Sequence, residues 1–298
     1  MSDQASERSG LWMAIVAYGL WGLFPIYWKL LGAVPALETL AHRVFWSAAF
    51  LVILLRARGA TAGALAVLRD PARRRTLALS SALLALNWGL FIWAVANRRV
   101  SEASLGYYIN PLLNVLLARL VLGETLRPVQ VVAVGVAALG VASLAVARGA
   151  LPWVSLVLAA SFSVYGLLRK RAPVGALDGL AVETAFTTPL AVAYLLWLSP
   201  PFGHLSQASP LVMTLLVGSG VATALPLLAF AGAARRLRYA TLGMVQYLAP
   251  TLQLACAVGL YGEPFRQEHA IAFGLIWSAI ALYVADSLRQ RRVPAVAS

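Results

Sequence analysis

The hydrophobic pattern of the chain consists of long apolar runs separated by short polar or basic connections. A helix that crosses a bilayer needs about 20 mostly apolar residues. Ten segments meet this requirement: 11–31, 36–55, 77–96, 103–122, 129–146, 151–168, 180–198, 210–232, 240–261 and 269–288. Because lipid offers backbone N–H and C=O groups no partners, these segments should be helices packed as one bundle. The pattern therefore predicts an all-α integral membrane protein with ten transmembrane helices.

The composition agrees with a membrane protein and narrows its function. Of the 298 residues, 61% are hydrophobic and 12% are charged, whereas a soluble domain of this length is far more polar. The net charge of +13 could suggest a nucleic-acid binder, but the short connections leave no soluble domain to present a basic face. We expect a lipid bilayer and no nucleic acid as partners. Enzyme and nucleotide-binding motifs are absent, so we expect no cofactor, no metal and no enzyme activity.

The distribution of basic residues predicts the orientation. With the N-terminus in the cytoplasm, 18 of the 24 Lys and Arg residues fall on the cytoplasmic side, and four fall outside: Arg98, Arg99, Arg148 and Arg266. The other two, Lys29 and Arg43, lie within spans. Positive charge is concentrated on the cytoplasmic side of membrane proteins. We therefore expect both termini in the cytoplasm.

Two short motifs mark similar halves of the chain. The stretches "GETLR" at 123–127 and "GEPFR" at 262–266 both read Gly-Glu-x-x-Arg. Around them, residues 97–127 align with 234–266 after a two-residue insertion, which pairs Pro111 with Pro250 and Asn114 with Gln253. Each half, 1–148 and 149–298, holds five spans, and an odd number inserts the second half upside down. We expect two inverted five-helix repeats, with the Gly ending one helix and the Glu near a helix start.

The chain also carries a family likeness from 11 to 288. The matching stretches include "WGLFPIYWKLL", "AHRVFWS", "NWGLFIWAV", "EASLGYYINPLLN", "YGLLRK", "LRYATLGMVQYLAPT" and "YGE". With these it resembles the drug/metabolite transporter superfamily in its ten-span EamA form, and within it the RarD branch of chloramphenicol-sensitivity permeases. The resemblance implies a carrier of the bacterial inner membrane and an exporter. Inverted repeats are also typical of alternating-access carriers with a site near the midplane.

Charged residues inside a span are costly and are candidates for a site. His42 and Arg43 lie about 10 Å along their helix at 1.5 Å per residue, and Arg43 either pairs with Glu38 or serves a cavity. Lys29 is expected to extend to the membrane surface. His42 ordinarily titrates near neutral pH and is a candidate for coupling. The acidic residues of the spans lie near span ends, so we expect no carboxylate at mid-membrane: Glu38, Glu183 and Asp286.

Amide and aromatic side chains complete the predicted substrate-binding set. Mid-span prolines should bend spans four and nine and open a central site between them. The alternative is that the amides only join helices, and that an aromatic residue such as Trp28 belongs to an interfacial belt. The remaining candidates for the cavity are Trp21, Asn87, Trp88, Tyr107, Tyr108, Asn110, Asn114, Tyr165, Gln246, Tyr247 and Gln253.

These features predict an alternating-access transporter that exports small amphipathic molecules, such as amino acids or drug-like compounds, through a central cavity. The alternatives are a facilitative channel, which would show a filter motif, and a carrier of phosphorylated metabolites, which would need several deep cations. A membrane enzyme would need clustered acids at a membrane face. The sequence leaves the substrate, the direction and the coupling ion open, and it is compatible with a monomer.

Overall fold

The computed structural model describes residues 2–97, 99–147, 153–262, 264–265 and 267–292. The helices within these ranges are α1 (Ser2–Leu30), α2 (Ala36–Ala57), α3 (Thr61–Arg69), α4 (Pro71–Ala96), α5 (Val100–Leu122), α6 (Pro128–Ala147), α7 (Trp153–Arg171), α8 (Ala176–Trp197), the 3-10 helix η1 (Gly203–Ser206), α9 (Pro210–Arg236), α10 (Tyr239–Gln246), α11 (Leu248–Gly259) and α12 (Gln267–Arg292). The prediction of an all-helical fold is confirmed.

The predicted spans correspond to ten helical units. Among the described residues, nine units are long and apolar enough to cross a membrane, with α10 and α11 together forming one of them. The tenth unit, α7, ends in Arg169, Lys170 and Arg171 and buries three serines. It lies between α4 and α5, where protein rather than lipid surrounds its polar side chains. This explains why α7 is less apolar than the other units.

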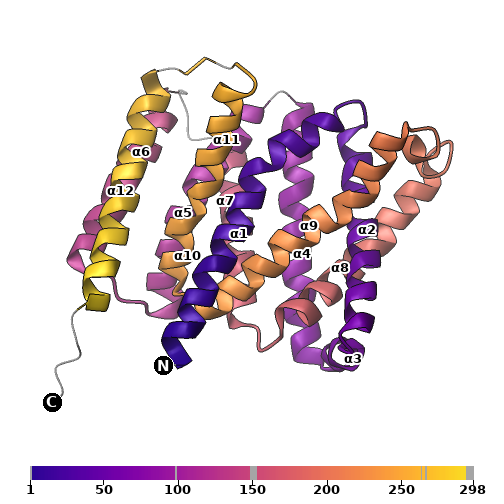
Figure 1. The fold of residues 1–298 in the computed structure, drawn as a ribbon, viewed down its shortest axis with the longest axis horizontal. Coiled ribbons are helices and arrows are strands. Elements are labelled where there is room, and N and C mark those ends of the chain that lie inside the picture. Colours follow the sequence, from indigo (N-terminus) through magenta and orange to yellow (C-terminus); the bar gives the residue numbers. More distant parts are fainter. Residues whose placement is uncertain (1, 98, 148–152, 263, 266, 293–298) are drawn as a thin grey trace.

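The helices form one elongated bundle (Figure 1). α6 packs against α12 at one end, α5 contacts α7 and α10, and α1 lies against α9 and α11. α2 packs on α8 and α9, and α4 on α7 and α8. The start of α1 and the end of α12 lie on the same side, called here the terminal side, and the connection between α1 and α2 lies on the opposite side (Figure 1).

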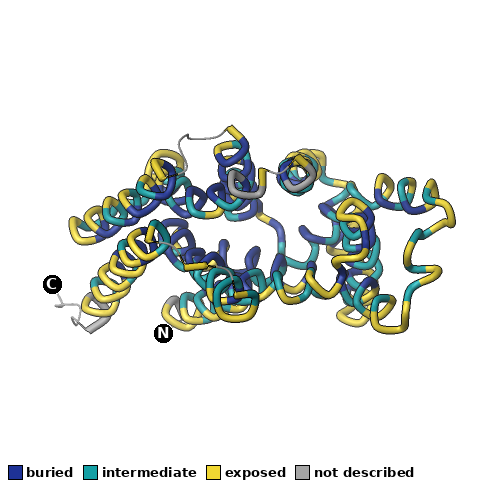
Figure 2. The backbone as a smooth tube through the Cα atoms, turned by 90° about the horizontal axis from the view of Figure 1, so that it is seen from above, coloured by how far each residue is buried: buried dark blue, intermediate teal, exposed yellow. Residues whose placement is uncertain are grey.

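The outer surface of the bundle is apolar, unlike that of a soluble protein. Buried residues face the interior, where the helices meet, and exposed residues cover the outer surface (Figure 2). Large apolar side chains are prominent on that surface, including Leu120, Val146, Leu190 and Trp197. Contiguous exposed apolar surface of this kind requires a nonpolar environment. The outer surface is therefore suited to contact with lipid.

The Gly-Glu turns have the expected glycine geometry. Gly123 ends α5 with φ +65°, and Gly262 follows α11 with φ +67°, a left-handed conformation that glycine adopts at little cost. Glu124 contacts the start of α10 rather than that of the next helix, α6. Four residues named in the predictions lie outside the described residues: Arg98, Arg148, Glu263 and Arg266.

Small residues allow α6 and α12 to approach closely. A Cβ on Gly140 would lie 2.9 Å from the backbone oxygen of Ala272, whereas a Cβ on Gly135 of the same helix would meet no atom within 4 Å. Ala133 and Ala137 are also fully buried. Because helices in lipid gain stability from such packing, Gly140 should be a point of sensitivity.

We expect Gly140→Leu to lower the thermal midpoint of the detergent-solubilised protein, because overpacking a close contact costs about 1–3 kcal/mol. Gly135→Leu on the same helix is the matched control and should leave the midpoint nearly unchanged. Thermal unfolding followed by size-exclusion chromatography measures both. Equal midpoints for the two variants would contradict the observed α6–α12 contact.

Candidate functional site

A cavity of about 780 Å³ lies at the centre of the bundle. Its walls come from both halves of the chain, with α1, α2, α4 and α5 on one part and α7, α9, α10 and α11 on the other. A volume of this size fits the range of small-molecule sites. The residues of the wall are mainly apolar and aromatic, with few polar groups among them.

The cavity is asymmetric along the bundle axis. It reaches the connection between α1 and α2, where residues 31–36 line it, and Ser104 near the start of α5. At its other end lies a cluster of aromatic rings, called here the aromatic plug: Tyr18, Trp21, Phe162, Tyr165 and Phe230. Trp21 contacts Phe162 and Phe230 with ring centroids 5.6 and 5.7 Å apart, and Tyr165 stacks on Phe230. The plug lies between the cavity and the terminal side.

Arg43 is the charged group of this cavity among the described residues that line it. Its Nε donates to the hydroxyl of Thr223 at 3.0 Å. Its guanidinium lies 4.6 Å from the ring centroid of Trp28 and 5.0 Å from that of Trp88, which is close enough for cation–π attraction. This arrangement holds the guanidinium in place without a carboxylate, so the positive charge remains available to a ligand.

Buried amides connect the two halves. Asn110 donates to the Ala159 carbonyl at 2.7 Å and to the Ser163 hydroxyl at 2.8 Å, and it accepts from the amide of Gln246. Gln246 in turn accepts from Asn114 at 2.7 Å. These bonds join α5, α7 and α10 below the cavity. The amides therefore act as helix contacts, and Asn110 and Gln246 also line the cavity.

Prolines supply carbonyl groups that the helices cannot pair. Proline has no N–H, so the carbonyl four residues earlier lacks its helical partner. Pro25 frees the carbonyl of Trp21, which accepts from Gln253 at 3.2 Å. The two spans differ around their prolines: α5 continues through Pro111 as one helix, whereas span nine divides at Tyr247, three residues before Pro250. The bend expected at Pro111 stays a prediction.

The structure brings together eight of the predicted substrate-binding residues on the cavity wall: Trp21, Arg43, Asn87, Trp88, Tyr107, Asn110, Gln246 and Gln253. The other five lie outside the wall: His42, Tyr108, Asn114, Tyr165 and Tyr247. His42 is fully buried next to Phe202 and Glu38. Tyr165 lies deeper in the aromatic plug. Aromatic and amide residues that pack helices have the same sequence signal as those that line a cavity.

Several cavity residues were missed or misplaced from the sequence. Trp28 lines the cavity and stacks on Arg43 instead of belonging to an outer belt, and Thr223 holds Arg43. Lys29, which was not predicted for the cavity, lies outside the wall, 3.6 Å over the ring of Tyr261. The spacing of Trp21 and Trp28 places them on one face of α1, and Trp28 was assigned to the belt because it lies near the end of its span.

The carboxylates of α2 and α8 are both buried; Glu38 lies in the first turn of its helix as expected, whereas Glu183 lies further from a helix end than expected. Glu38 accepts from the backbone N–H of His204 at 2.6 Å and contacts the His204 ring at 2.9 Å. Glu183 lies seven residues beyond the start of α8 and is 2% exposed. Among the described residues, the ion pairs of Glu38 are with His42 and His204, and Arg43 lies on the cavity wall.

The terminal side is closed by contacts between the halves. The carboxylate of Glu124 accepts from the N–H groups of Tyr239 and Ala240 at 2.6 and 3.1 Å, where the dipole of α10 favours negative charge. Arg171 donates to the Val121 carbonyl at 2.5 Å. Arg127 pairs with Asp286 at 2.5 Å. These contacts connect the α5–α6 region with α7, α10 and α12.

Comparison with known proteins gives concordant results. The sequence profile of the EamA-like transporter family matches residues 8–146. The chain is 46% identical to an uncharacterized transporter of Vibrio cholerae, over 96% of this chain and 95% of the relative. It is 41% identical to protein RarD of Escherichia coli, over 97% and 98%, and 36% identical to the chloramphenicol-sensitive protein RarD of Pseudomonas aeruginosa, over 95% and 96%.

A protein of known crystal structure has the same fold, with a TM-score of 0.73 over 93% of this chain and 98% of that chain, at 23% identity. The long apolar helices and the bacterial relatives indicate a multi-pass protein of the inner membrane. The relatives of Vibrio cholerae and Bacillus subtilis are named transporters. The chain belongs to the EamA-like transporter family of the drug/metabolite transporter superfamily, and within it to the RarD-like transporters.

Proposed function

We propose that the protein is an alternating-access carrier that exports small amphipathic carboxylates, such as amino acids, or drug-like compounds of similar shape. The observation that carries this proposal is a central cavity of about 780 Å³ with one arginine held between two tryptophans. A guanidinium binds a carboxylate with two parallel hydrogen bonds. The surrounding rings provide apolar faces for the rest of the molecule.

The closed end of the cavity favours a carrier over a channel. The aromatic plug lies between the cavity and the terminal side, and Glu124 joins the halves beneath it. A channel would offer a continuous path at some moment, whereas a carrier exposes its site to one side at a time. This geometry corresponds to a carrier state open toward the α1–α2 connection.

The charge of the cavity favours a carboxylate over a phosphate ester. Arg43 is the one charged side chain on the described wall, and Lys29 lies outside it. A phosphorylated substrate would need several cations at depth. The amide nitrogens of Asn87 and Gln253 donate to helix carbonyls, which leaves their amide oxygens to accept from the ammonium group of an amino acid.

The helix contacts support two inverted repeats, 1–148 and 149–298. The repeat pairs α1 with α7, α2 with α8, α4 with α9, α5 with α10–α11, and α6 with α12. If each helix is replaced by its partner in the other repeat, the contact of α1 with α9 becomes the contact of α7 with α4. In the same way, the contact of α1 with α11 becomes that of α7 with α5. All four contacts are observed. Because these contacts are related by one two-fold operation, the two halves can move against each other through equivalent interfaces. Since one chain encloses the cavity, a monomer is sufficient.

The function is tested by purifying the protein, reconstituting it in liposomes and measuring uptake of a labelled amino-acid panel. Uptake that unlabelled competitors suppress is the expected result. In the same assay, Arg43→Gln should raise the half-saturation concentration of carboxylate substrates about tenfold to a hundredfold, because a charge-assisted hydrogen bond contributes about 1.5–3 kcal/mol.

Lys29→Gln is the matched control, because it removes a cation of the same span region that lies outside the cavity. It should leave half-saturation unchanged. Arg43→Lys should be intermediate, since lysine keeps the charge and loses the planar fork. Unchanged carboxylate uptake in a folded Arg43→Gln protein would overturn the assignment of Arg43.

We place both termini in the cytoplasm, which the excess of basic residues on the terminal side supports. In a Cys256→Ala background, Ser206→Cys in η1 should react with an impermeant maleimide in intact cells. Thr61→Cys at the start of α3 should react only in inverted vesicles. Both positions are exposed. The reverse labelling pattern would reverse the orientation and, with it, the side on which the cavity is open.

Glu124 should stabilise the closed terminal side. Replacing its carboxylate by an amide in Glu124→Gln weakens the contact with the start of α10, and loss of a helix cap costs about 1 kcal/mol. Hydrogen–deuterium exchange of residues 239–246 should then accelerate about fivefold. Asp70→Asn is the matched control, because Asp70 caps α4 through Ala72 and Arg73. It should accelerate exchange near the start of α4 and leave 239–246 unchanged.

A further inference from the structure

A buried ion pair lies beside the cavity, in a region that the proposed substrate does not contact. Arg169 of α7 and Glu183 of α8 are 1% and 2% exposed. Nη1 of Arg169 lies 3.7 Å from Oε1 of Glu183, which is too long for a good hydrogen bond. The Ser80 hydroxyl of α4 donates to the same oxygen. The pair therefore connects three helices through one carboxylate oxygen.

The other oxygen of this carboxylate has no partner. Oε2 of Glu183 makes no hydrogen bond, and neither do Nε and Nη1 of Arg169. The Tyr165 hydroxyl lies beside the carboxylate and also lacks a hydrogen bond of normal geometry. Removing two charges from water is costly unless close geometry and further hydrogen bonds compensate. The carboxylate is therefore weakly compensated, and a proton on Oε2 would neutralise its charge.

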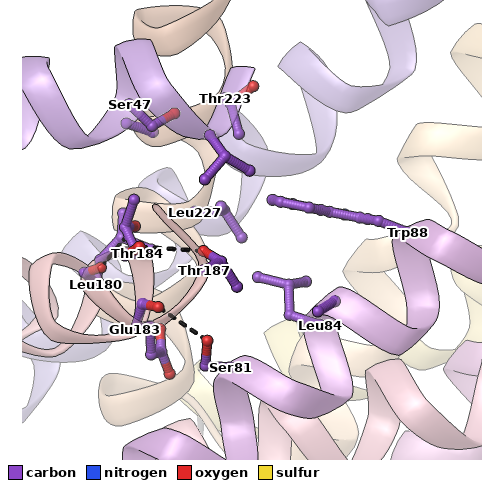
Figure 3. A pocket seen from close by; sticks show the side chains of 13 residues that line it. Ser47, Ser81, Leu84, Trp88, Leu180, Glu183, Thr184, Thr187, Thr223 and Leu227 are labelled. Atoms are coloured by element: carbon purple, nitrogen blue, oxygen red, sulfur yellow. Dashed lines mark hydrogen bonds between the residues drawn. The ribbon is translucent and has the colours of Figure 1, made fainter. Parts of the chain in front are cut away.

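A small pocket next to Glu183 shares part of its wall with the cavity. Its volume is about 20 Å³, enough for roughly one water molecule. Glu183 and Ser81 lie at one end and Trp88 and Thr223 at the other (Figure 3). Trp88, Thr223 and Leu227 line both this pocket and the cavity. A water molecule here would lie between the cavity and the carboxylate.

We propose that Glu183 is a proton-binding site coupled to transport, and that the pocket gives protons access to it from the cavity. The proposal rests on the carrier function above. One proton passes from water in the pocket to Oε2, and the carboxylate becomes a neutral carboxylic acid. The charged and titratable groups that face Glu183 are Arg169 and Tyr165, both of α7; α4 contributes the hydroxyls of Ser80 and Ser81.

Protonation at Glu183 would act on the plug. The network then carries the charge of Arg169 alone, so the attraction between α7 and α8 is lost. Arg169 lies so close to Gly179 of α8 that a Cβ there would meet its Nη1, and the two helices cannot tighten around it further. Tyr165, which faces Glu183, stacks on Phe230 in the aromatic plug. The proton site and the closed end of the cavity therefore share a side chain.

The first test needs no substrate. Infrared spectra of the purified protein, recorded across a pH series, should show the C=O stretch of a protonated carboxylic acid shielded from solvent. Glu183→Gln should remove this band. Asp286→Asn is the matched control, because Asp286 forms a close ion pair with Arg127 away from the pocket, and it should leave the band in place.

Ser80→Ala keeps the test independent of whether Glu183→Gln folds. It removes the donor to Oε1, so the same band should remain and move to higher frequency, because hydrogen bonds lower a C=O stretch. A wild-type protein without the band, or a band that survives in folded Glu183→Gln, would overturn the proposal.

The second test measures coupling in liposomes with the amino acid that the uptake panel identifies. Wild-type accumulation should depend on an imposed pH gradient. Glu183→Gln should lose at least nine-tenths of this dependence and keep counterflow exchange, which requires the carrier but no proton. A gradient response retained by Glu183→Gln, or absent from wild type, would overturn the proton site. A panel without any uptake would overturn the proposed substrate class instead, and the infrared result would still decide the role of Glu183.

Discussion

The structure depends on one constraint: a polar group in the hydrocarbon region must find its partner within the protein. The constraint explains the helices themselves, and it also explains where polar side chains lie. Asn110, Asn114 and Gln246 bond one another and the carbonyls of neighbouring helices. These bonds cross between the two halves. The need to pair polar groups in lipid, which keeps the backbone helical, therefore also fixes the relative position of the halves beneath the cavity.

The cavity is one place where this requirement is not completely met by the protein, and the Arg169–Glu183 pair is another. Arg43 has a hydroxyl and two aromatic faces as neighbours and no carboxylate, so a substrate carboxylate can complete its environment. The opposite holds on the terminal side, where Glu124, Arg127 and Arg171 all have close partners. The contrast between Arg43 in the cavity and the paired groups Glu124, Arg127 and Arg171 on the terminal side is what a binding site with a reversible closure requires.

Much of this fold could be predicted from the sequence, because lipid imposes a strong pattern. The spans, the helical class and the left-handed glycines at 123 and 262 follow from apolar length and turn chemistry, and Arg43 was identified because charge is rare at such depth. It was harder to predict whether a side chain faces the cavity or a neighbouring helix. Tyr108, Asn114 and Tyr247 resemble cavity residues in type and depth, yet they pack against neighbouring helices. Sequence periodicity gives a helix face but not the identity of the neighbour that covers it.

The burial of Glu183 was also hard to predict from the sequence, and its position suggests how proton binding and substrate binding could be coupled. Glu183 looked peripheral because it is near the start of its helix, but depth along a helix differs from burial when α4 and α7 cover that turn. Trp88 and Thr223 contact Arg43 on the cavity side, and they also line the far end of the small pocket that contains Glu183. A carboxylate substrate at Arg43 and a proton at Glu183 would therefore act at the two ends of one pocket. Two ligands that bias one shared element affect each other's binding reciprocally, and this is the physical requirement for coupling one flux to another.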